Sequence, residues 1–326
     1  MPQAVTVYMS SDAGAPQIGD SRPSDIFNIL KKCLVEGYGT KNPLGWSVPF
    51  EDTTNRKIAF RNDTTNGGSG GYLSLYSQGA NNDMGGVVRI TYAKSMTSLD
   101  DYIGKGFTQA FVNYNYDCDK WLLVGTSTAF YFFFIRNTGL LQPGFVNASG
   151  FFAGDFQSTI PNDAGRFIAF SNPAVGMSDS TNAGSWPWHL AYPIYSSSGN
   201  FLKIYNADNS DVFVGYTYNS LFRVTYASSL TQNPDYQTNI VSPFVILTES
   251  IPSITNQSVL NQQEVAPYFR GCMPGLYLNT KAAPNDSIFG QTVNIGSVEY
   301  LIMPTLGLFP LVMLIKLGVW DEPFTS

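Results

Sequence analysis

Side chains that could perform catalysis are few in this chain, and they are widely spaced. The only histidine, His189, lies in the aromatic and proline-rich segment "GSWPWHLAYP", and no nucleophile stands where it would pair with it. General acid–base and nucleophilic catalysis both need such a partner within hydrogen-bond reach. We therefore interpret His189 as a loop residue that packs beside the neighbouring tryptophans.

Paired carboxylates are the other catalytic arrangement that the sequence offers. Asp117 and Asp119 flank Cys118, and Asp100 is followed directly by Asp101. A glycosidase needs two carboxyl groups that face each other across a cleft. Neighbours along a strand point to opposite faces instead, so we interpret both pairs as turn residues and expect that the protein is not an enzyme.

Metal and phosphate sites are not indicated either, and we expect no cofactor. The three cysteines, Cys33, Cys118 and Cys272, are too scattered for a zinc motif or a disulfide framework. The "DNSD" segment at 208–211 lacks the other ligands of a calcium loop. The "NGGSGG" segment at 66–71 has no following Lys-Ser/Thr, so it predicts a flexible hairpin tip and not a phosphate-binding loop.

One aromatic segment could contact a partner. "WPWHLAYPIY" places Trp186, Trp188, Tyr192 and Tyr195 within a short stretch that contains two prolines. Exposed aromatic rings provide a large contact area and can stack on sugars or pack on a protein. The alternative is a loop that is tucked under a sheet. Both interpretations stay open, with these four residues as the candidate contact surface.

The composition indicates a β-rich protein with uncharged polar faces. Only 13% of the 326 residues are charged, and 14% are aromatic, which does not suit a helical enzyme with Lys- and Glu-covered surfaces. The formal net charge is −6, and Lys31-Lys32 is the only basic doublet. Nucleic acid is therefore not an expected partner, because phosphate binding needs clustered Lys and Arg.

No membrane span or secretory signal is expected. The apolar run 129–135 is much shorter than the roughly 20 residues that a spanning helix needs, and Pro304 and Pro310 interrupt the apolar C-terminal stretch. The N-terminus lacks a basic region followed by an apolar one. With few cysteines, this indicates synthesis in a reducing compartment.

Hydrophobic periodicity predicts an all-β fold with one short helix. The helix covers residues about 25–36, with Ser24 as N-cap, Gly37 as its end, and an apolar stripe from Ile26 to Leu34. The segments 121–125 and 129–135 are predicted to form a hairpin that is buried on both faces. Strands are predicted at 6–9, 57–61, 71–76, 87–92, 121–125, 129–135, 151–156, 167–170, 201–205, 212–216, 222–226, 298–303 and 311–317.

Composition shifts divide the chain into three zones. Residues 1–115 are predicted to form an N-terminal β unit with the helix, and residues 116–230 an aromatic-rich β unit. Residues 231–326 hold a connector and a C-terminal β segment. We therefore expect two or three units that resemble β-sandwiches or barrels.

Several motifs resemble those of tailed-bacteriophage virion structural proteins. The N-terminal stretch follows the pattern S-x-D-x-G-A-P, then a short helix, then C-L-V-x-G-Y-G-x-K-x-x-x-G-W. The matching residues are Ser11, Asp12, Gly14, Ala15, Pro16, Cys33, Leu34, Val35, Gly37, Tyr38, Gly39, Lys41, Gly45 and Trp46.

Two later landmarks fit the same pattern. "WLLVGTSTAFYFFF" followed by "FFAGDFQSTIPNDAG" is similar to its Trp-start hairpin and F-G-D-F-x-S segment, in which Gly154, Asp155, Phe156, Gln157 and Ser158 match. "RGCMPGLY" is similar to its R-G-x-x-P-G-L-Y turn, with Arg270, Gly271, Pro274, Gly275, Leu276 and Tyr277. The chain departs from the pattern at residues 84–104 and in its apolar C-terminus.

The resemblance implies a structural protein of the tail or baseplate, present in several copies in the virion and made in the host cytoplasm. Its partners would be other virion proteins and further copies of itself, and a host surface glycan is a further candidate. The resemblance implies no catalytic residue. The alternatives are a capsid decoration protein, a carbohydrate-binding or receptor-contacting module and, from another class, a glycan-degrading enzyme.

Overall fold

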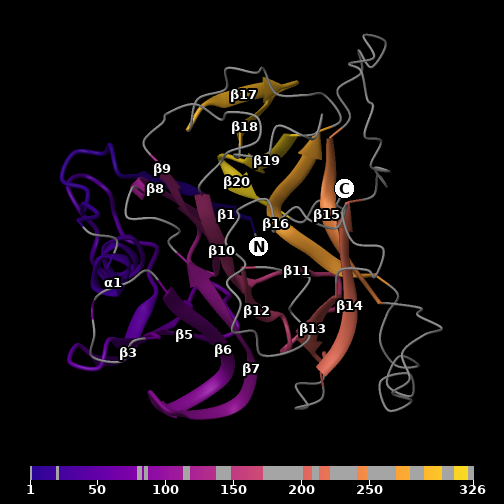
Figure 1. The fold of residues 1–326 in the computed structure, drawn as a ribbon. Helices are drawn as coiled ribbons and strands as arrows, with labels where there is room; N and C mark the ends of the chain where they lie inside the picture. Colours follow the sequence, from indigo (N-terminus) through magenta and orange to yellow (C-terminus); the bar gives the residue numbers. More distant parts are fainter. Residues whose placement is uncertain are drawn as a thin grey trace, which may run out of the picture.

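The structure is a computed structural model, and it describes most of the N-terminal half and separate strands of the C-terminal half. The described residues are 2–19, 22–78, 83, 87–112, 118–136, 148–171, 201–207, 213–220, 241–248, 269–279, 290–302 and 312–321. Their fold is antiparallel β throughout with one N-terminal helical segment (Figure 1). The predicted all-β class is therefore confirmed.

Three sheets and one short ribbon contain all the described strands. One five-stranded sheet has the order β12 (Phe167–Phe170), β10 (Ala148–Asp155), β9 (Ala129–Arg136), β8 (Cys118–Gly125), β2 (Thr6–Met9). A second has the order β3 (Ser47–Asp52), β4 (Lys57–Arg61), β5 (Tyr72–Ser77), β6 (Val87–Ser98), β7 (Asp101–Val112). We call them the central sheet and the N-terminal sheet.

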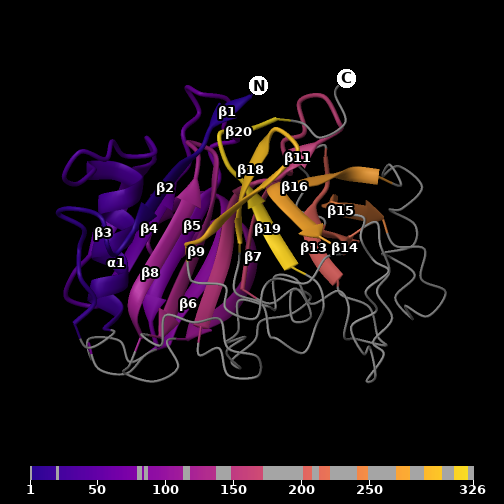
Figure 2. The same cartoon turned by 90° about the horizontal axis from the view of Figure 1, so that it is seen from above.

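The third sheet, the C-terminal sheet, is eight-stranded. Its order is β13 (Phe201–Tyr205), β14 (Phe213–Ser220), β15 (Val241–Thr248), β16 (Phe269–Asn279), β19 (Val312–Lys316), β18 (Val298–Ile302), β17 (Thr292–Ile295), with β11 (Gln157–Ser158) paired to β16. A ribbon of β1 (Gln3–Ala4) and β20 (Val319–Trp320) joins the two ends of the chain. Figures 1 and 2 show the central sheet between the other two.

Strand β9 lies at the centre of the central sheet and is buried on both faces, as predicted. The side chains from Phe130 to Phe134 are all fully buried, although neighbours on a strand point in opposite directions. The short connection to β8 is closed by a hydrogen bond from the Thr126 N–H to the Ala129 carbonyl (2.8 Å). The predicted hairpin of aromatic residues is therefore confirmed.

A single hydrophobic core connects the three sheets. It contains Phe60 from the N-terminal sheet, Phe132 from the central sheet and Leu276 from the C-terminal sheet, each fully buried. This core therefore includes residues of all three predicted zones. The zone boundaries near residues 115 and 230 lie outside the described residues and stay predictions.

The helical segment consists of α1 (Pro23–Lys31) and a π-helical turn, η1 (Lys32–Glu36). Its apolar stripe is fully buried, as predicted, and it ends at Gly37 with a φ of 79°. The predicted N-cap is wrong, because the N-cap is Arg22 and the helix begins two residues earlier than expected, at Pro23, a residue suited to the first helical turn.

Ser24 instead binds a residue that is distant in the sequence. Its N–H and its Oγ donate to the carboxylate of Asp83 at 3.0 and 2.5 Å, across 59 residues. The Nε of Arg56 lies 3.2 Å from the same carboxylate. A negative charge beside the helix N-terminus is stabilising, because the first backbone N–H groups have no partner within the helix. Sequence reasoning could not find this contact.

We predict that Leu30→Ala lowers the free energy of unfolding by about 2–5 kcal/mol, because Leu30 is fully buried and its truncation leaves a cavity. The control is Asn28→Ala on the exposed face of the same helix, with an expected change within about 0.5 kcal/mol. Chemical denaturation measures both. A Leu30→Ala loss below about 1 kcal/mol would show that the helix is peripheral to the core.

Candidate functional site

The predicted contact surface lies outside the described residues. This holds for Trp186, Trp188, Tyr192 and Tyr195, and also for His189. The 208–211 segment, Asp117 and the predicted strand 222–226 lie outside as well, and Asp119 lies on β8 with its side chain undescribed. The interpretations of these residues stay predictions.

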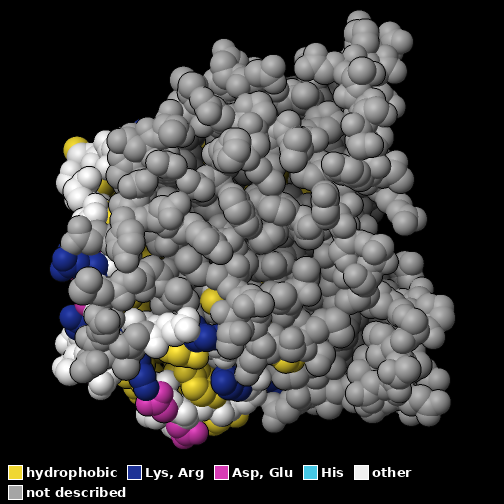
Figure 3. Space-filling model, in the orientation of Figure 1, with side chains coloured by type: hydrophobic (Ala, Val, Ile, Leu, Met, Phe, Trp, Pro, Cys, Tyr) yellow, Lys and Arg dark blue, Asp and Glu magenta, His cyan; other side chains and the backbone are white. Residues whose placement is uncertain are grey.

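Asp100 and Asp101 lie at the tip of the β6–β7 hairpin, where Ser98 pairs with Asp101. Asp100 forms an ion pair with Lys57 (2.6 Å), and Asp101 accepts a hydrogen bond from the Thr97 hydroxyl. Figure 3 shows hydrophobic and charged side chains together on the described surface over this hairpin. The interpretation as a turn residue is confirmed for Asp100, whereas Asp101 is the first residue of β7.

The glycine-rich segment at 66–71 connects β4 to β5 and is a hairpin loop, as predicted. Its backbone forms hydrogen bonds with other segments, and the predicted flexibility stays a prediction. Gly70 donates its N–H to the Asn62 side chain (2.7 Å), and Arg166 donates to the Gly67 carbonyl (2.5 Å). Ser69 donates both its N–H and its Oγ to Asp155, at 2.7 and 2.5 Å.

The N-terminal motif residues form a polar cluster, which we call the Asp12 cluster: Asp12, Tyr38 and Lys41. The Asp12 carboxylate accepts hydrogen bonds from the Met9 N–H (2.9 Å) and the Tyr38 hydroxyl (2.8 Å). Lys41 lies 3.8 Å from Asp12 and donates to the Val7 carbonyl on β2 (2.9 Å). Burial, followed by the hydrogen bond to Asp12, raises the pKa of Tyr38, so that its hydroxyl stays a donor.

Two glycines let the motif loops approach each other. Gly14 and Gly39 have φ values of 78° and 52°, in the region that side chains rarely adopt. A Cβ on Gly39 would overlap the carbonyl of Ala13, and one on Gly14 would lie 3.3 Å from the Gly39 nitrogen. The loop after β2 therefore packs directly on the backbone of the loop after the helix.

The later motifs meet in a second cluster, which we call the Arg270 cluster: Ser158, Asp163 and Arg270. Gln157 and Ser158 form β11, which pairs with Gly271 and Cys272 on β16. Arg270 donates two hydrogen bonds to Asp163, from Nε at 2.6 Å and from Nη2 at 2.7 Å.

Both charged side chains of this pair are fully buried, with 0% exposure. The Ser158 hydroxyl donates to the Asp163 carboxylate (2.6 Å), and Arg270 also donates to the Tyr205 carbonyl (3.2 Å). A buried ion pair needs such additional hydrogen bonds, because both charges have lost their water. The Arg270 cluster therefore joins the loop before β12 to two strands of the C-terminal sheet.

Asp155 of the F-G-D-F-x-S motif is also buried and paired. It lies at the end of β10, is 6% exposed, and accepts a bond from the Arg166 Nε at 3.1 Å in addition to those from Ser69. Burial raises the pKa of Asp155, and the attraction of Arg166 and the hydrogen bonds from Ser69 offset this only in part. Asp155 therefore anchors the glycine-rich loop of the N-terminal sheet to the central sheet.

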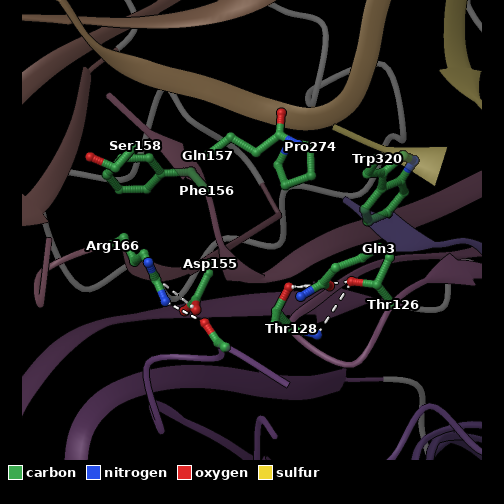
Figure 4. Close-up of a pocket in the computed structure, with 11 residues that line it drawn as sticks. Gln3, Thr126, Thr128, Asp155, Phe156, Gln157, Ser158, Arg166, Pro274 and Trp320 are labelled. Atoms are coloured by element: carbon green, nitrogen blue, oxygen red, sulfur yellow. Dashed lines mark hydrogen bonds and ion pairs between the residues drawn. The ribbon is translucent and has the colours of Figure 1, made fainter. Parts of the chain in front are cut away.

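A small polar pocket of about 100 Å³ lies beside Asp155 and Arg166 (Figure 4). Gln3 and Thr128 face it from the opposite wall and are bonded to each other at 2.8 Å. Trp320 also lines the pocket and donates to the Lys316 carbonyl (2.9 Å). This volume holds roughly three water molecules. The lining contains one carboxylate, and glycoside hydrolysis needs two.

The described cysteines and acidic residues do not assemble a metal or nucleophile site. Among the described residues, no group of three or more His, Cys, Asp or Glu side chains could hold a metal ion. Burial raises the pKa of the Cys272 thiol to about 12, and burial followed by the nearby Asp12 charge raises that of Cys33 well above its usual range. Both described thiols are therefore protonated at neutral pH, whereas the thiolate is the nucleophile.

No helix among the described residues is long and apolar enough to cross a membrane. In comparisons with known proteins, no family model matches the chain, and no curated protein matches its sequence. The resemblance to virion proteins thus stays an expectation that depends on the motifs themselves.

Sequence reasoning found the motifs and missed their contacts. A signal was present, since Asp155 and Arg270 are isolated charges beside buried apolar strands in a chain that is poor in charge. A charge in such a position is expected to have a partner. The identity of that partner depends on which loops the fold brings together.

We predict that Arg270→Met lowers the free energy of unfolding by about 3–5 kcal/mol, because it leaves the Asp163 carboxylate buried without its partner. The double variant Arg270→Met/Asp163→Leu should lose less, since it removes both charges. Lys57→Met is the matched control at an exposed ion pair and should cost less than about 1 kcal/mol. Equal losses for Arg270→Met and Lys57→Met in urea denaturation would contradict this.

We also predict opposite pH dependences at two aspartates. The pKa of Asp155 is raised in the folded state, so its contribution to stability is greatest below the unfolded value of about 3.9 and falls as the pH rises through the folded pKa. Wild type should therefore lose stability relative to Asp155→Asn as the pH rises from about 4.

Asp63 should show the reverse dependence. Burial alone would raise its pKa, but hydrogen bonds from Asn66 and Thr65 outweigh burial and hold it below its usual value. Its contribution is present above about 3.9 and is lost as the pH falls through the folded pKa. Wild type should gain stability relative to Asp63→Asn as the pH rises from about 2.5 to 5. Urea unfolding across the pH range measures both slopes, and slopes of the same sign would refute the assignment.

Proposed function

We propose that this chain is a structural component of a tailed-phage virion, assembling in several copies in the tail or baseplate region. One observation carries the proposal. Residues that match the virion-protein pattern form the Asp12 cluster and the Arg270 cluster, which brace loops and sheets against each other. That the motif residues build the contacts between loops and sheets of this chain supports membership of that structural class.

The use of charged side chains supports the same function. Asp155, Asp163 and Arg270 are buried and bonded to protein groups, so they fix the positions of backbone segments. Charges that are satisfied in this way have little capacity left for binding or transforming a substrate. The expectation that the protein is not an enzyme remains a prediction.

A surface without dense charge also suits lateral contacts between virion proteins. Protein interfaces combine an apolar centre with a polar rim and are depleted of charge at the centre. The β6–β7 hairpin presents such a mixture, with Ile103 50% exposed near Lys105 and the Lys57–Asp100 ion pair. Further copies of the chain and other virion proteins are the partners that this proposal names.

The test is the presence of the chain in virions. Particles are purified on a density gradient from the host culture that produces this chain, and its peptides are quantified by mass spectrometry against the major capsid protein. We expect several copies per particle. A chain that is abundant in the lysate but absent from the purified particles would refute the proposal.

A map of the labelled particle distinguishes the tail from the capsid. A tag on the chain should lie on the tail or baseplate, and particles made without the chain should fail to assemble a complete tail or to infect. Label spread over the capsid shell would favour the decoration protein instead. In that case the virion assignment would hold and the tail position would be wrong.

A further inference from the structure

Strand β17 is the last strand of the C-terminal sheet and lies at the margin of the fold (Figure 1). Among the described strands, only β18 pairs with it, so its second side has no strand partner in that part of the chain. An edge strand of this kind presents a row of backbone donors and acceptors to a further strand. Its chemistry therefore decides what it could bind.

The register of the β17–β18 hairpin identifies the outward-facing groups. Ile295 pairs with Val298 across a two-residue turn, and the Ile302 N–H donates to the Gln291 carbonyl at 2.9 Å. In an antiparallel ladder, alternate residues bond to the same neighbour. Residues 291, 293 and 295 therefore bond to β18, and Thr292 and Asn294 direct their N–H and C=O groups away from it.

The side chains of this edge are uncharged. Thr292 and Asn294 are exposed, and Val293 and Ile295 are partly buried against the cluster around Tyr300. Strands that avoid pairing usually carry Lys, Pro or a bulge on the edge. β17 has none of these devices.

Three other edge strands of the described sheets, β3, β2 and β7, have features that limit pairing. Edge strand β3 contains Pro49 and a register shift. The Val7 carbonyl on edge strand β2 accepts a hydrogen bond from Lys41 (2.9 Å). The Ala110 carbonyl on edge strand β7 accepts one from the Ser171 hydroxyl (3.2 Å). In contrast to these three edges, β17 is an uncharged edge without Lys, Pro or a bulge.

We propose that β17 pairs antiparallel with β17 of a second copy of this chain, about a two-fold axis through Val293. Thr292 then lies opposite Asn294 of the second copy, and each pair exchanges two backbone hydrogen bonds. A second copy is the favoured occupant because a two-fold contact brings each edge residue near its own equivalent. Such an arrangement requires an edge without charge.

The proposed contact is short, and its strength depends on whether other contacts already hold the two copies together. Three paired residues on each strand, 292–294, bury less than the roughly 1,000 Å² of a stable dimer, so isolated chains should associate weakly and in a concentration-dependent way. Copies that other contacts hold in an array would pair far more tightly. The inference rests on the proposed function, because a virion would supply such an array. It identifies one contact between the copies.

Charged substitutions on the β17 edge test the pairing. Thr292→Lys/Asn294→Lys and Thr292→Glu/Asn294→Glu each place like charges opposite each other across the two-fold axis, so each should associate at least tenfold more weakly than wild type. An equimolar mixture should recover association, because Lys then faces Glu at both positions. Sedimentation velocity over a range of concentrations measures this, and a misfolded chain could not give the recovery.

Two further variants complete the test. Ser297→Lys changes the exposed turn beside the edge and should associate like wild type. Asn294→Pro removes one outward N–H without removing a bond to β18, and it should weaken association even if the charged variants fold poorly. A wild-type chain that stays monomeric, or variants that associate like wild type, would overturn the proposal, as would a mixture of folded variants without recovery.

The outcome is separable from the particle test. A chain that is present in virions but does not pair through β17 refutes only this inference. A chain that pairs through β17 but is absent from particles refutes only the virion assignment.

Discussion

The burial of β9 on both faces is the constraint on which the rest of the fold depends. The ring of Phe130 lies 5.2 Å from that of Trp46, the residue before β3 of the N-terminal sheet. Tyr131 points the other way, with its ring 5.7 Å from Trp320 and its hydroxyl bonded to the Pro274 carbonyl at 2.9 Å. A strand of this kind cannot be the surface of a two-layer protein, because half of its aromatic rings would lie in water. A third layer is therefore required.

The polar clusters follow from this layered packing. Where loops of one sheet meet strands of another, backbone groups lose water and need protein partners. Asp155, Asp163 and Arg270 supply them, and the charges of Asp163 and Arg270 compensate each other within the same contacts. A buried ion pair adds little net stability, but a shift of β16 would leave Arg270 buried without a partner. We infer that the Arg270 cluster chiefly specifies how the C-terminal sheet docks.

The small number of charged side chains affects both the interior of the protein and its association with other proteins. Asp155, Asp163 and Arg270 are the charged residues buried at internal contacts in the described part of the chain, and strand β17 has no charged residue. Neutral edges and mixed apolar surfaces favour association between proteins, and dense single-sign charge favours solubility and nucleic-acid binding. The proposed β17 pairing uses that distribution, and the proposed virion role is compatible with it. They differ in scale, since one concerns the particle and the other a single contact.

The sequence alone determined the all-β class, the helix with its apolar stripe, and the buried β8–β9 hairpin, because periodicity and turn residues act over a few positions. It did not indicate β7, β15 or β16 as strands, whose mixed composition lacks a clear alternation. Only the tertiary structure decided that Asp83 binds Ser24, that Asp155 holds Ser69, and that Asp163 pairs with Arg270. These partners are 59, 86 and 107 residues apart. Contacts at such separations depend on how the sheets dock, which no local pattern encodes.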